Sequence, residues 1–412
     1  MALDEFDPYA DRFFAGDWDS YGQLRDVEPV HRNTRLDFWV LSRYDDVSTG
    51  FRDWETYSSA QGTMLDQLNT PGFSSESMPG WLLVYDPPAH TRLRQLAVSA
   101  FTPRAVDELE GAVRRAVTRA ADSVAGREQF DLVADFAKSI PGEVMFDLMG
   151  VPEEGRQRAT HLFDDFLYAG DEGETGEFNQ TRVRAMTELM TYLGGLVQAK
   201  RANPGDDITS RLFEATYLAD GVEQRLTDEE MCLYLLLLLS AGTETTAKLV
   251  GSAAVALFRH PEQWAKILAD PNHIPAAVNE AGRYESPVQF LGRKTTRDVT
   301  LHGTPIPAGS NVLLLMGSAN RDERVYPDPD RFDIERNFPR PPLTYGWGPH
   351  LCLGMRLARL EVQAAVEEIR LRWPHHAVDE SGLQRLRGFH VFGWAKVPVT
   401  VSADAPVSSL TP

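Results

Sequence analysis

The chain has 412 residues, of which 42% are hydrophobic and 25% charged, with 31 glycines and 26 prolines. These fractions are typical of a globular protein and exclude collagen-like and disordered chains. The formal net charge of −19 argues against nucleic acid and anionic membranes as partners, because phosphate repels so acidic a chain. The acidic N-terminus lacks the order of a signal peptide, and the longest apolar run, residues 231–239, is about half a membrane span. We therefore expect a soluble, cytoplasmic protein.

The chain shows no internal repeat, low-complexity tract or long linker, so we expect one large domain over residues 1–412. Strand-like alternation marks residues 30–44, and helical periodicity dominates residues 89–270. Residues 299–315 are strand-like again, a last helix covers about 353–373, and strand-like stretches follow near 391 and over 397–401. This order predicts a mainly α fold with minor β.

The clearest predicted element is a helix from Thr227 to about Phe258. Thr227 and Glu230 form a capping box, and Pro261 lies just beyond the end. The helix is apolar all round before its midpoint, so it must cross the core. Its middle, residues 241–246, reads Ala-Gly-Thr-Glu-Thr-Thr, which suits a buried helix poorly. Residues that suit a buried helix poorly, when they lie in the middle of a core helix, indicate a functional site.

The two cysteines exclude a disulfide framework and any CxxC metal site. Cys232 lies inside the apolar helix and fits a small buried cysteine. Cys352 instead follows a Gly/Pro-punctuated loop and precedes a helix, whose free N–H groups stabilise a thiolate. The pattern aromatic-x-x-Gly-x-x-x-Cys-x-Gly over residues 345–354 resembles the heme-binding loop of the cytochrome P-450 family, the heme-thiolate monooxygenases. The family usually has Phe where this chain has Tyr345.

A second resemblance to the family lies upstream of this loop. Glu280 and Arg283 match its Glu-x-x-Arg helix motif and lie one helical turn apart. Arg331, within residues 329–332, matches the usual third partner. The resemblance implies that these three residues form a buried ion-pair cluster that positions the heme-binding loop, a structural role.

The resemblance implies a single cofactor, heme b (iron protoporphyrin IX), with Cys352 as the iron ligand. It makes Glu244 and Thr245 the catalytic acid and hydroxyl of proton delivery, while Gly242 leaves room for O2 against the helix. Carboxylates need cationic or hydrogen-bonding partners. Four basic residues at family positions would hold the carboxylates of the heme propionates, namely His90, Arg94, Arg293 and His350. The implied cofactor-binding residues are His90, Arg94, Gly242, Arg293, Tyr345, Gly348, His350, Cys352 and Gly354.

The substrate pocket is predicted from family position, and its residues are mostly apolar, as small-molecule pockets usually are. It draws on residues 64–84, 163–168, 289–291 and 389–392, and residues 170–177 are predicted to form a surface loop and part of a lid. The pocket residues singled out are Leu82, Leu237, Ser240, Ala241, Gln289, Phe290, Leu291 and Phe392. They indicate a moderately apolar organic substrate.

The family uses two electrons and two protons to split O2 and inserts one oxygen atom into the substrate. The chain has no GxGxxG fingerprint, no cysteine cluster and no flavin domain. We therefore expect the electrons to come from a separate ferredoxin or flavodoxin with its NAD(P)H-dependent reductase. Arg92, Arg356 and Arg359 are candidates for a docking patch, and the family is mostly monomeric, so a monomer is expected.

Three alternatives stay open at this point. The first keeps the heme but performs oxidative coupling or peroxide-driven oxidation. The second is a non-catalytic heme protein that binds or senses a ligand, and the third is a helical scaffold without a cofactor. The acid–hydroxyl pair of Glu244 and Thr245 favours activation of O2, because a pure binder needs no proton delivery, but it leaves coupling open.

Overall fold

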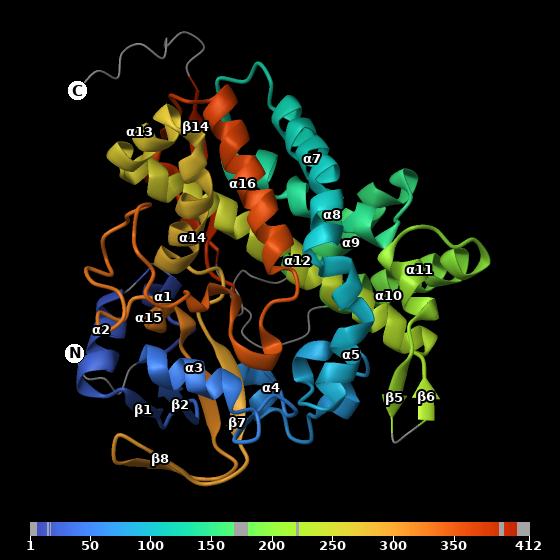
Figure 1. Cartoon of the computed structure of the whole chain (residues 1–412), viewed down its shortest axis with the longest axis vertical. Helices are drawn as coiled ribbons and strands as arrows, with labels where there is room; N and C mark the ends of the chain where they lie inside the picture. Colours follow the sequence, from blue (N-terminus) through green and yellow to red (C-terminus); the bar gives the residue numbers. More distant parts are fainter. Residues whose placement is uncertain are drawn as a thin grey trace.

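The computed structural model describes residues 6–14, 16, 18–168, 180–219, 222–386 and 391–401 (Figure 1). The helices are α1 (Asp11–Phe14), α2 (Trp18–Val27), α3 (Tyr44–Arg52), α4 (Leu65–Asn69), α5 (Ala89–Val98), α6 (Pro103–Glu108), α7 (Glu110–Ser123), α8 (Ser139–Met149), α9 (Glu153–Tyr168), α10 (Gln180–Ala202), α11 (Ile208–Glu214), α12 (Asp228–Arg259), α13 (Pro261–Ala269), α14 (Ile274–Tyr284), α15 (Met316–Ala319) and α16 (Met355–Arg372). The strands are β1 (Val30–Asn33), β2 (Phe38–Leu41), β3 (Tyr57–Ser58), β4 (Gln129–Asp131), β5 (Tyr217–Ala219), β6 (Val222–Gln224), β7 (Leu291–Thr295), β8 (Val299–Leu301), β9 (Thr304–Ile306), β10 (Asn311–Leu314), β11 (Ala377–Val378), β12 (Gln384–Arg385), β13 (Trp394–Lys396) and β14 (Pro398–Thr400).

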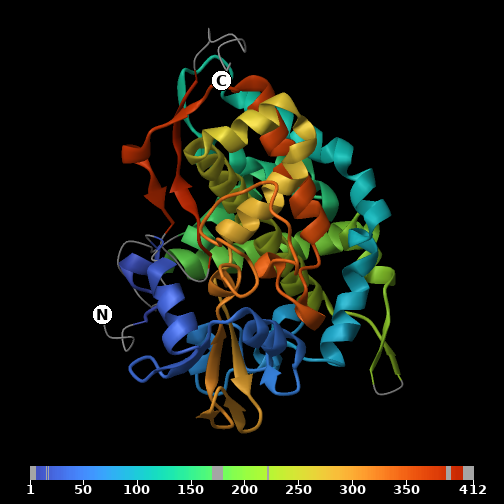
Figure 2. The ribbon, with the colours of Figure 1, turned by 60° about the vertical axis from the view of Figure 1, so that its left-hand side comes forward.

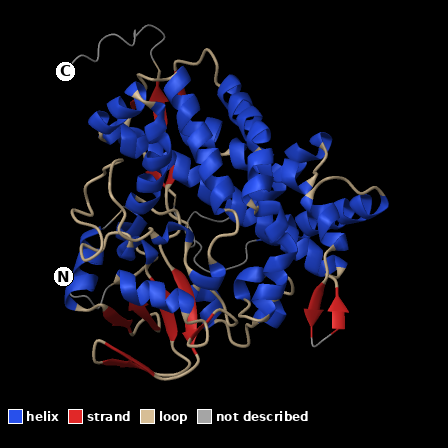
Figure 3. Ribbon diagram, in the orientation of Figure 1, coloured by secondary structure: helices blue, strands red, loops and turns tan. Residues whose placement is uncertain are grey.

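The prediction of a mainly α fold with minor β is confirmed, because helices make up most of the molecule and the strands form small sheets (Figure 3). The strand-like segment at 30–44 becomes β1 and β2, and the segment at 299–315 becomes β8, β9 and β10. The helical stretch of residues 89–270 is interrupted by three short strands, β4, β5 and β6, which the periodicity did not reveal. The single-domain organisation stays a prediction.

Helix α12 is the centre of the molecule and confirms the predicted capping box. The backbone N–H of Glu230 donates to Thr227 Oγ1 over 3.2 Å, and the backbone N–H of Thr227 donates to Glu230 Oε2 over 2.8 Å. At the other end α13 begins at Pro261. Helices α8, α10, α14 and α16 pack around α12, which crosses the molecule in Figures 1 and 2. The largest hydrophobic cluster surrounds this helix.

Within the described part of the chain, α12 is also the one helix with the length and hydropathy of a membrane span. However, 72% of its most apolar window is buried inside the protein. That burial is typical of the core helix of a globular protein, which passes the same test of length and composition.

A five-stranded sheet joins the N-terminal segment to a segment 250 residues further along. Its strand order is β1-β2-β10-β7-β3, in which β2 and β10 are parallel and the other neighbours are antiparallel. Side chains alternate between the faces of a strand. Accordingly, Val312 and Leu314 of β10 belong to one hydrophobic cluster, and Leu313 belongs to another on the opposite face. The register pairs Asn311 with Lys294 across β10 and β7.

Candidate active site

The loop before α16 presents Cys352 at the point where the helix begins. Gly346 and Gly348 adopt positive φ angles of 71° and 69°, which favour glycine. At Gly348 a Cβ would lie 2.6 Å from the carbonyl oxygen of Phe51, so a side chain there would collide with the end of α3. The loop closes on itself, because the backbone N–H of Cys352 donates to the carbonyl oxygen of Tyr345 over 2.9 Å.

Cys352 is exposed although protein atoms surround it, a combination that is typical of a group lining an internal hollow. Burial raises the pKa of the thiol, while the backbone N–H of Gly354 and the charge of Arg94 lower it. Cys232 is buried at the start of α12, and burial together with Asp228 raises the pKa of its thiol. Only Cys352 has a nearby cation and an open face.

Four basic residues predicted from separate segments converge beside Cys352. His90 and Arg94 lie one turn apart on α5, Arg293 lies on β7, and His350 lies in the short 3-10 turn Gly348–His350. The rings of His90 and His350 are 4.0 Å apart between centroids. Arg94 acts on both Cys352 and His90, and Arg293 acts on both histidines, so the four groups share one environment. The predicted juxtaposition of these residues is present in the structure.

Among the described residues, this cluster of basic groups has little counter-charge, since the carboxylate that acts on it is that of Asp86, which acts on Arg293. Burial, then Arg94 and Arg293, lowers the pKa of His90 to about 4, and burial lowers the pKa of Arg293 to about 10. Both ring nitrogens of His90 are buried without a hydrogen-bond partner in the described structure. Asp86 also accepts hydrogen bonds from the hydroxyl of Ser58 and the backbone N–H of Ser59. Basic groups that repel one another in a buried site fit the carboxylates of heme propionates.

The middle of α12 is open on one side. Ala241 is exposed and Ser240, Gly242, Glu244 and Thr245 are partly exposed, although the helix is buried before and after this window. A short accessible stretch in an otherwise buried helix indicates a hollow beside it. The hydroxyl of Thr245 donates to the carbonyl oxygen of Ala241 over 3.0 Å. A Cβ on Gly242 would lie 2.7 Å from the sulfur of Met145, so close packing against α8 is a reason for this glycine that the sequence did not suggest.

Glu244, although partly exposed, takes part in an ion pair that sequence reasoning missed. Its side chain is 9% exposed, that of Lys248 is 5% exposed, and Lys248 Nζ lies 4.0 Å from Glu244 Oε1. Burial lowers the pKa of Lys248, and the charge of Glu244 raises it. The signal was present, because the two residues lie at i and i+4 on a helix predicted to be buried. Both residues also make further interactions.

The predicted ion-pair cluster forms, but with a different third member. Arg283 Nε and Glu280 Oε2 are 2.7 Å apart, and both side chains are fully buried. Arg331 does not join them, because its side chain is 64% exposed and pairs with Asp333. The third member is Arg336, whose side chain is 7% exposed and whose Nε lies 3.1 Å from Glu280 Oε1. Arg331 contributes its backbone carbonyl oxygen instead, which accepts from Arg283.

The loop tyrosine has a partner on the following helix. The guanidinium of Arg359 lies 5.1 Å from the centroid of the Tyr345 ring. Burial raises the pKa of Tyr345 to about 12, and the charge and hydrogen bonding of Arg359 lower it. Since Arg359 is held there, it is less free to dock a partner protein than Arg356, which is exposed.

The predicted pocket residues occupy two kinds of environment. Ser240, Ala241 and Leu291 are accessible, whereas Leu82 and Leu237 are buried nearby in the main core. Three others are almost completely buried in a separate aromatic cluster at the N-terminal side, namely Gln289, Phe290 and Phe392. Tyr21 donates to Gln289 over 2.9 Å, and the ring of Phe13 lies 6.1 Å from those of Phe290 and Phe392. The predicted lid at 170–177 and residues 389 and 390 of the predicted pocket lie outside the described residues.

Comparison with known proteins agrees with this site. The family model described as "Cytochrome P450" matches residues 173–381. The putative cytochrome P450 123 of Mycobacterium tuberculosis is 38% identical over 397 residues, which cover 96% of this chain and 97% of that protein. The structure of cytochrome P450 CYP109Q5 from Chondromyces apiculatus superposes with a TM-score of 0.87 at 32% identity, covering 97% and 99% of the two chains. A methyl-branched lipid omega-hydroxylase of M. tuberculosis is 36% identical over 370 residues, 88% of this chain and 84% of that one.

This chain therefore belongs to the cytochrome P450 family. It is a P450 monooxygenase, and its cofactor is heme b. Bacterial members of the family generally use an organic substrate, O2 and separate redox partners. Family membership removes the cofactor-free scaffold and the non-catalytic binder from the alternatives.

Proposed function

We propose that this P450 inserts one oxygen atom of O2 into a moderately apolar organic molecule by hydroxylation or epoxidation, with Cys352 as the thiolate ligand of the heme iron. The main support for this proposal is that the exposed Cys352 and four basic groups, which come from α5, β7 and the loop of Cys352 itself, lie together at one site. Cys352 is the cysteine of the chain with an open face and an adjacent cation.

The bound heme supplies the oxidising chemistry, and a thiolate ligand favours cleavage of the O–O bond. The chain's own residues hold the cofactor in place and provide its thiolate ligand. Arg94 and Arg293 pair with its carboxylates, and His90 and His350 donate hydrogen bonds to them. Binding therefore supplies the negative charge that the two arginines favour and the partners that the two rings lack. The backbone N–H of Gly354 donates to the sulfur of Cys352 and stabilises the thiolate form.

Two residues of α12 move protons in this proposal. Glu244 holds a proton at its carboxyl group and passes it toward the hollow, and Thr245 donates from Oγ1. In the described structure Thr245 Oγ1 donates to Ala241, and Glu244 lies beside Lys248. Both side chains must therefore release a partner on their own helix before they face the hollow. Lys248 is a positioning residue, since it favours the ionised form of Glu244 between proton transfers.

The substrate class follows from the accessible and apolar residues of the predicted pocket. Ser240, Ala241 and Leu291 offer one hydroxyl and otherwise apolar contacts, with Leu82 and Leu237 behind them. A relative that acts as a methyl-branched lipid omega-hydroxylase supports an apolar substrate. We further propose a cytoplasmic monomer that receives electrons from a separate ferredoxin or flavodoxin and its NAD(P)H-dependent reductase, docked near Arg92 and Arg356.

The test is turnover in isotopically labelled oxygen. Compounds that shift the spin state of the heme are first selected from a library, and then turned over under ¹⁸O2 with a surrogate ferredoxin and reductase. One ¹⁸O atom per product molecule supports the proposal. A product that lacks ¹⁸O means oxidative coupling, and a product formed only with added peroxide means the peroxide-driven reaction. Either result contradicts the proposed function.

A further inference from the structure

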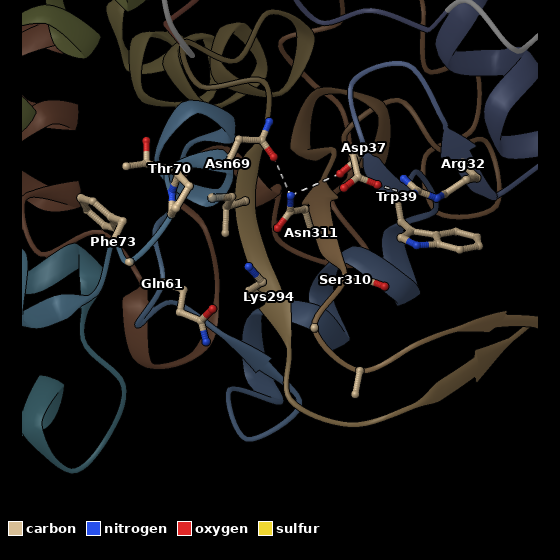
Figure 4. Close-up of a pocket in the computed structure, with 15 residues that line it drawn as sticks. Arg32, Asp37, Trp39, Gln61, Asn69, Thr70, Phe73, Lys294, Ser310 and Asn311 are labelled. Atoms are coloured by element: carbon tan, nitrogen blue, oxygen red, sulfur yellow. Dashed lines mark hydrogen bonds and ion pairs between the residues drawn. The ribbon is translucent and has the colours of Figure 1, made fainter.

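A cleft of about 460 Å³ lies at the five-stranded sheet, away from the candidate active site (Figure 4). One wall is α4 with the loop that follows it, and another is the turn between β9 and β10. Lys294 of β7 lies in the cleft, whereas Arg293 points to the opposite face of the strand, 5.3 Å from the ring of Phe51. The sheet therefore separates the cleft from the basic groups beside Cys352. The volume falls within the range of small-molecule sites.

The cleft contains a cation without a counter-charge. Lys294 is half-buried, and within the described residues no carboxylate forms an ion pair with it. The acidic residue that lines the cleft, Asp37, is already paired with Arg32. The chain has 60 acidic residues, yet none of the described ones neutralises this half-buried lysine. A cation of this kind provides a local site for an anion, because screening by salt confines the repulsion of distant carboxylates.

Beside this cation, a buried amide has an unused acceptor. Asn311 is 8% exposed, and its Nδ2 donates to Asn69 Oδ1 over 2.8 Å and to the carbonyl oxygen of Asp37 over 3.2 Å. Both of these partners are acceptors, which fixes the orientation of the amide. Asn311 Oδ1 is buried without a partner in the described structure, and in Figure 4 it points to the side of Lys294. A ligand that donates a hydrogen bond would satisfy it.

We propose that this cleft is a second binding site, for a small organic hydroxy acid. The carboxylate binds Lys294 Nζ, and the neighbouring hydroxyl donates to Asn311 Oδ1. The amide of Gln61 is exposed beside them, and the rings of Phe73 and Trp39 line the two ends of the cleft for the apolar part of the ligand (Figure 4). Such a ligand bridges the sheet and the loop after α4, two segments that are more than 200 residues apart in the sequence. This inference does not depend on the roles of Glu244 or Cys352.

The test uses the heme-loaded enzyme and 4-fluoromandelate, which carries a carboxylate, an adjacent hydroxyl and a fluorine visible by ¹⁹F NMR. Saturable binding is expected, and binding at least tenfold weaker is expected for the neutral amide of the same acid. Lys294→Met and Asn311→Leu should each weaken binding at least tenfold, while Lys294→Arg retains it. Lys396→Met, a change at an exposed lysine of β13, is the matched control and should bind as the wild type does.

Binding at the heme is excluded by a second measurement. The heme spectrum should not change on addition of 4-fluoromandelate, and saturating imidazole, which ligates the iron, should not displace it. Absence of saturable binding, equal binding by Lys294→Met, or displacement by imidazole would each overturn the proposal. The reduced–carbon monoxide spectrum is unaffected by any of these outcomes, so failure here is distinguishable from failure of the proposed function.

Discussion

Two clusters of basic groups inside this protein differ in what satisfies their charge. In the first, Glu280 accepts from Arg283, Arg336 and the backbone N–H of Asp333, and Arg283 donates to three backbone carbonyl oxygens as well. Every charge there has protein partners. In the second, beside Cys352, Arg94 and Arg293 carry charge of one sign, and burial together with these two charges lowers the pKa of His90 and His350, which favours their neutral forms.

This difference distinguishes buried charges that stabilise the fold from buried charges that bind a ligand. A closed network with both signs stabilises the fold by itself, and its members need nothing from outside. A cluster of one sign destabilises the fold until a ligand of the opposite sign arrives, as binding energy then compensates for the cost. Substitutions that break one cluster or the other make their different dependence on the cofactor measurable.

The largest effect is expected from Glu280→Gln, which leaves two buried arginines without their carboxylate. The free energy of unfolding should fall by about 3–5 kcal/mol, in the heme-free and the heme-loaded protein alike. Denaturant titration of both forms measures this. Glu335→Gln is the control, because Glu335 forms an exposed pair with Lys266 and its loss should cost less than about 1 kcal/mol. A loss seen only with heme bound would mean that the first cluster also serves the cofactor.

Glu361 on α16 offers a third case, a buried carboxyl group to which the described part of the chain gives no cationic partner. Burial raises its pKa to about 8, a hydrogen bond with Thr246 lowers it, and Oε1 has no partner in the described structure. The unfolded chain therefore releases this proton from about pH 4.5 upward, while the folded protein keeps it until about pH 8. Stability from this group is present below pH 4.5 and is lost as pH rises, with a slope of about 1.4 kcal/mol per pH unit.

Glu361→Gln should remove that slope. Urea titrations between pH 5 and pH 7.5 compare the variant with the wild type, whose unfolding free energy should fall more steeply over this range. Glu367→Gln, a partly exposed position on the same helix, should keep the wild-type slope. Equal slopes in wild type and Glu361→Gln would show that this carboxyl is ionised in the folded protein.

Arg293→Met addresses the cluster of one sign. Because burial opposes the charge of Arg293, its removal should raise the unfolding free energy of the heme-free protein by about 1–3 kcal/mol. The same change should accelerate release of heme to an acceptor protein, since one propionate partner is lost. Arg297→Met, at an exposed position just beyond the same strand, is expected to change neither quantity. A heme-free variant less stable than the wild type would contradict the account.

The smallest effect is expected from Lys248→Met, which separates the buried pair beside the hollow. Without the ammonium group, Glu244 favours its protonated form. The fall in product formed per NAD(P)H consumed at high pH should therefore move to higher pH, with less peroxide released there than by the wild type. Lys138→Met removes a more exposed lysine that also acts on Lys248, and it should leave the profile in place. An unchanged profile in Lys248→Met would remove its positioning role.

Local patterns predicted the elements of this fold well, and long-range partners poorly. The capping box of Thr227 and Glu230 depends on residues three apart, and it forms as expected. Arg331 and Arg336 lie five residues apart on one irregular segment, where no periodicity says which side chain turns inward. The resemblance favoured Arg331, but the chain buries Arg336.

The candidate site shows the same division. The four basic residues could be placed together, because a family pattern links segments that are distant in the sequence. Gln289 and Phe392 could not be told from pocket residues by type alone, and the structure packs them with Tyr21 and Phe13 of the N-terminal segment. That segment carries no motif, so nothing in the sequence indicated that it covers them.

The measurement that tests the central claim most directly is the carbon monoxide difference spectrum of the reduced, heme-loaded protein, recorded for wild type, Cys352→Ala and Cys232→Ala. The account predicts the red-shifted Soret band of thiolate ligation in the wild type and in Cys232→Ala, and its loss in Cys352→Ala. Survival of that band in Cys352→Ala, or its loss in a folded Cys232→Ala, would contradict the assignment of Cys352 as the heme ligand.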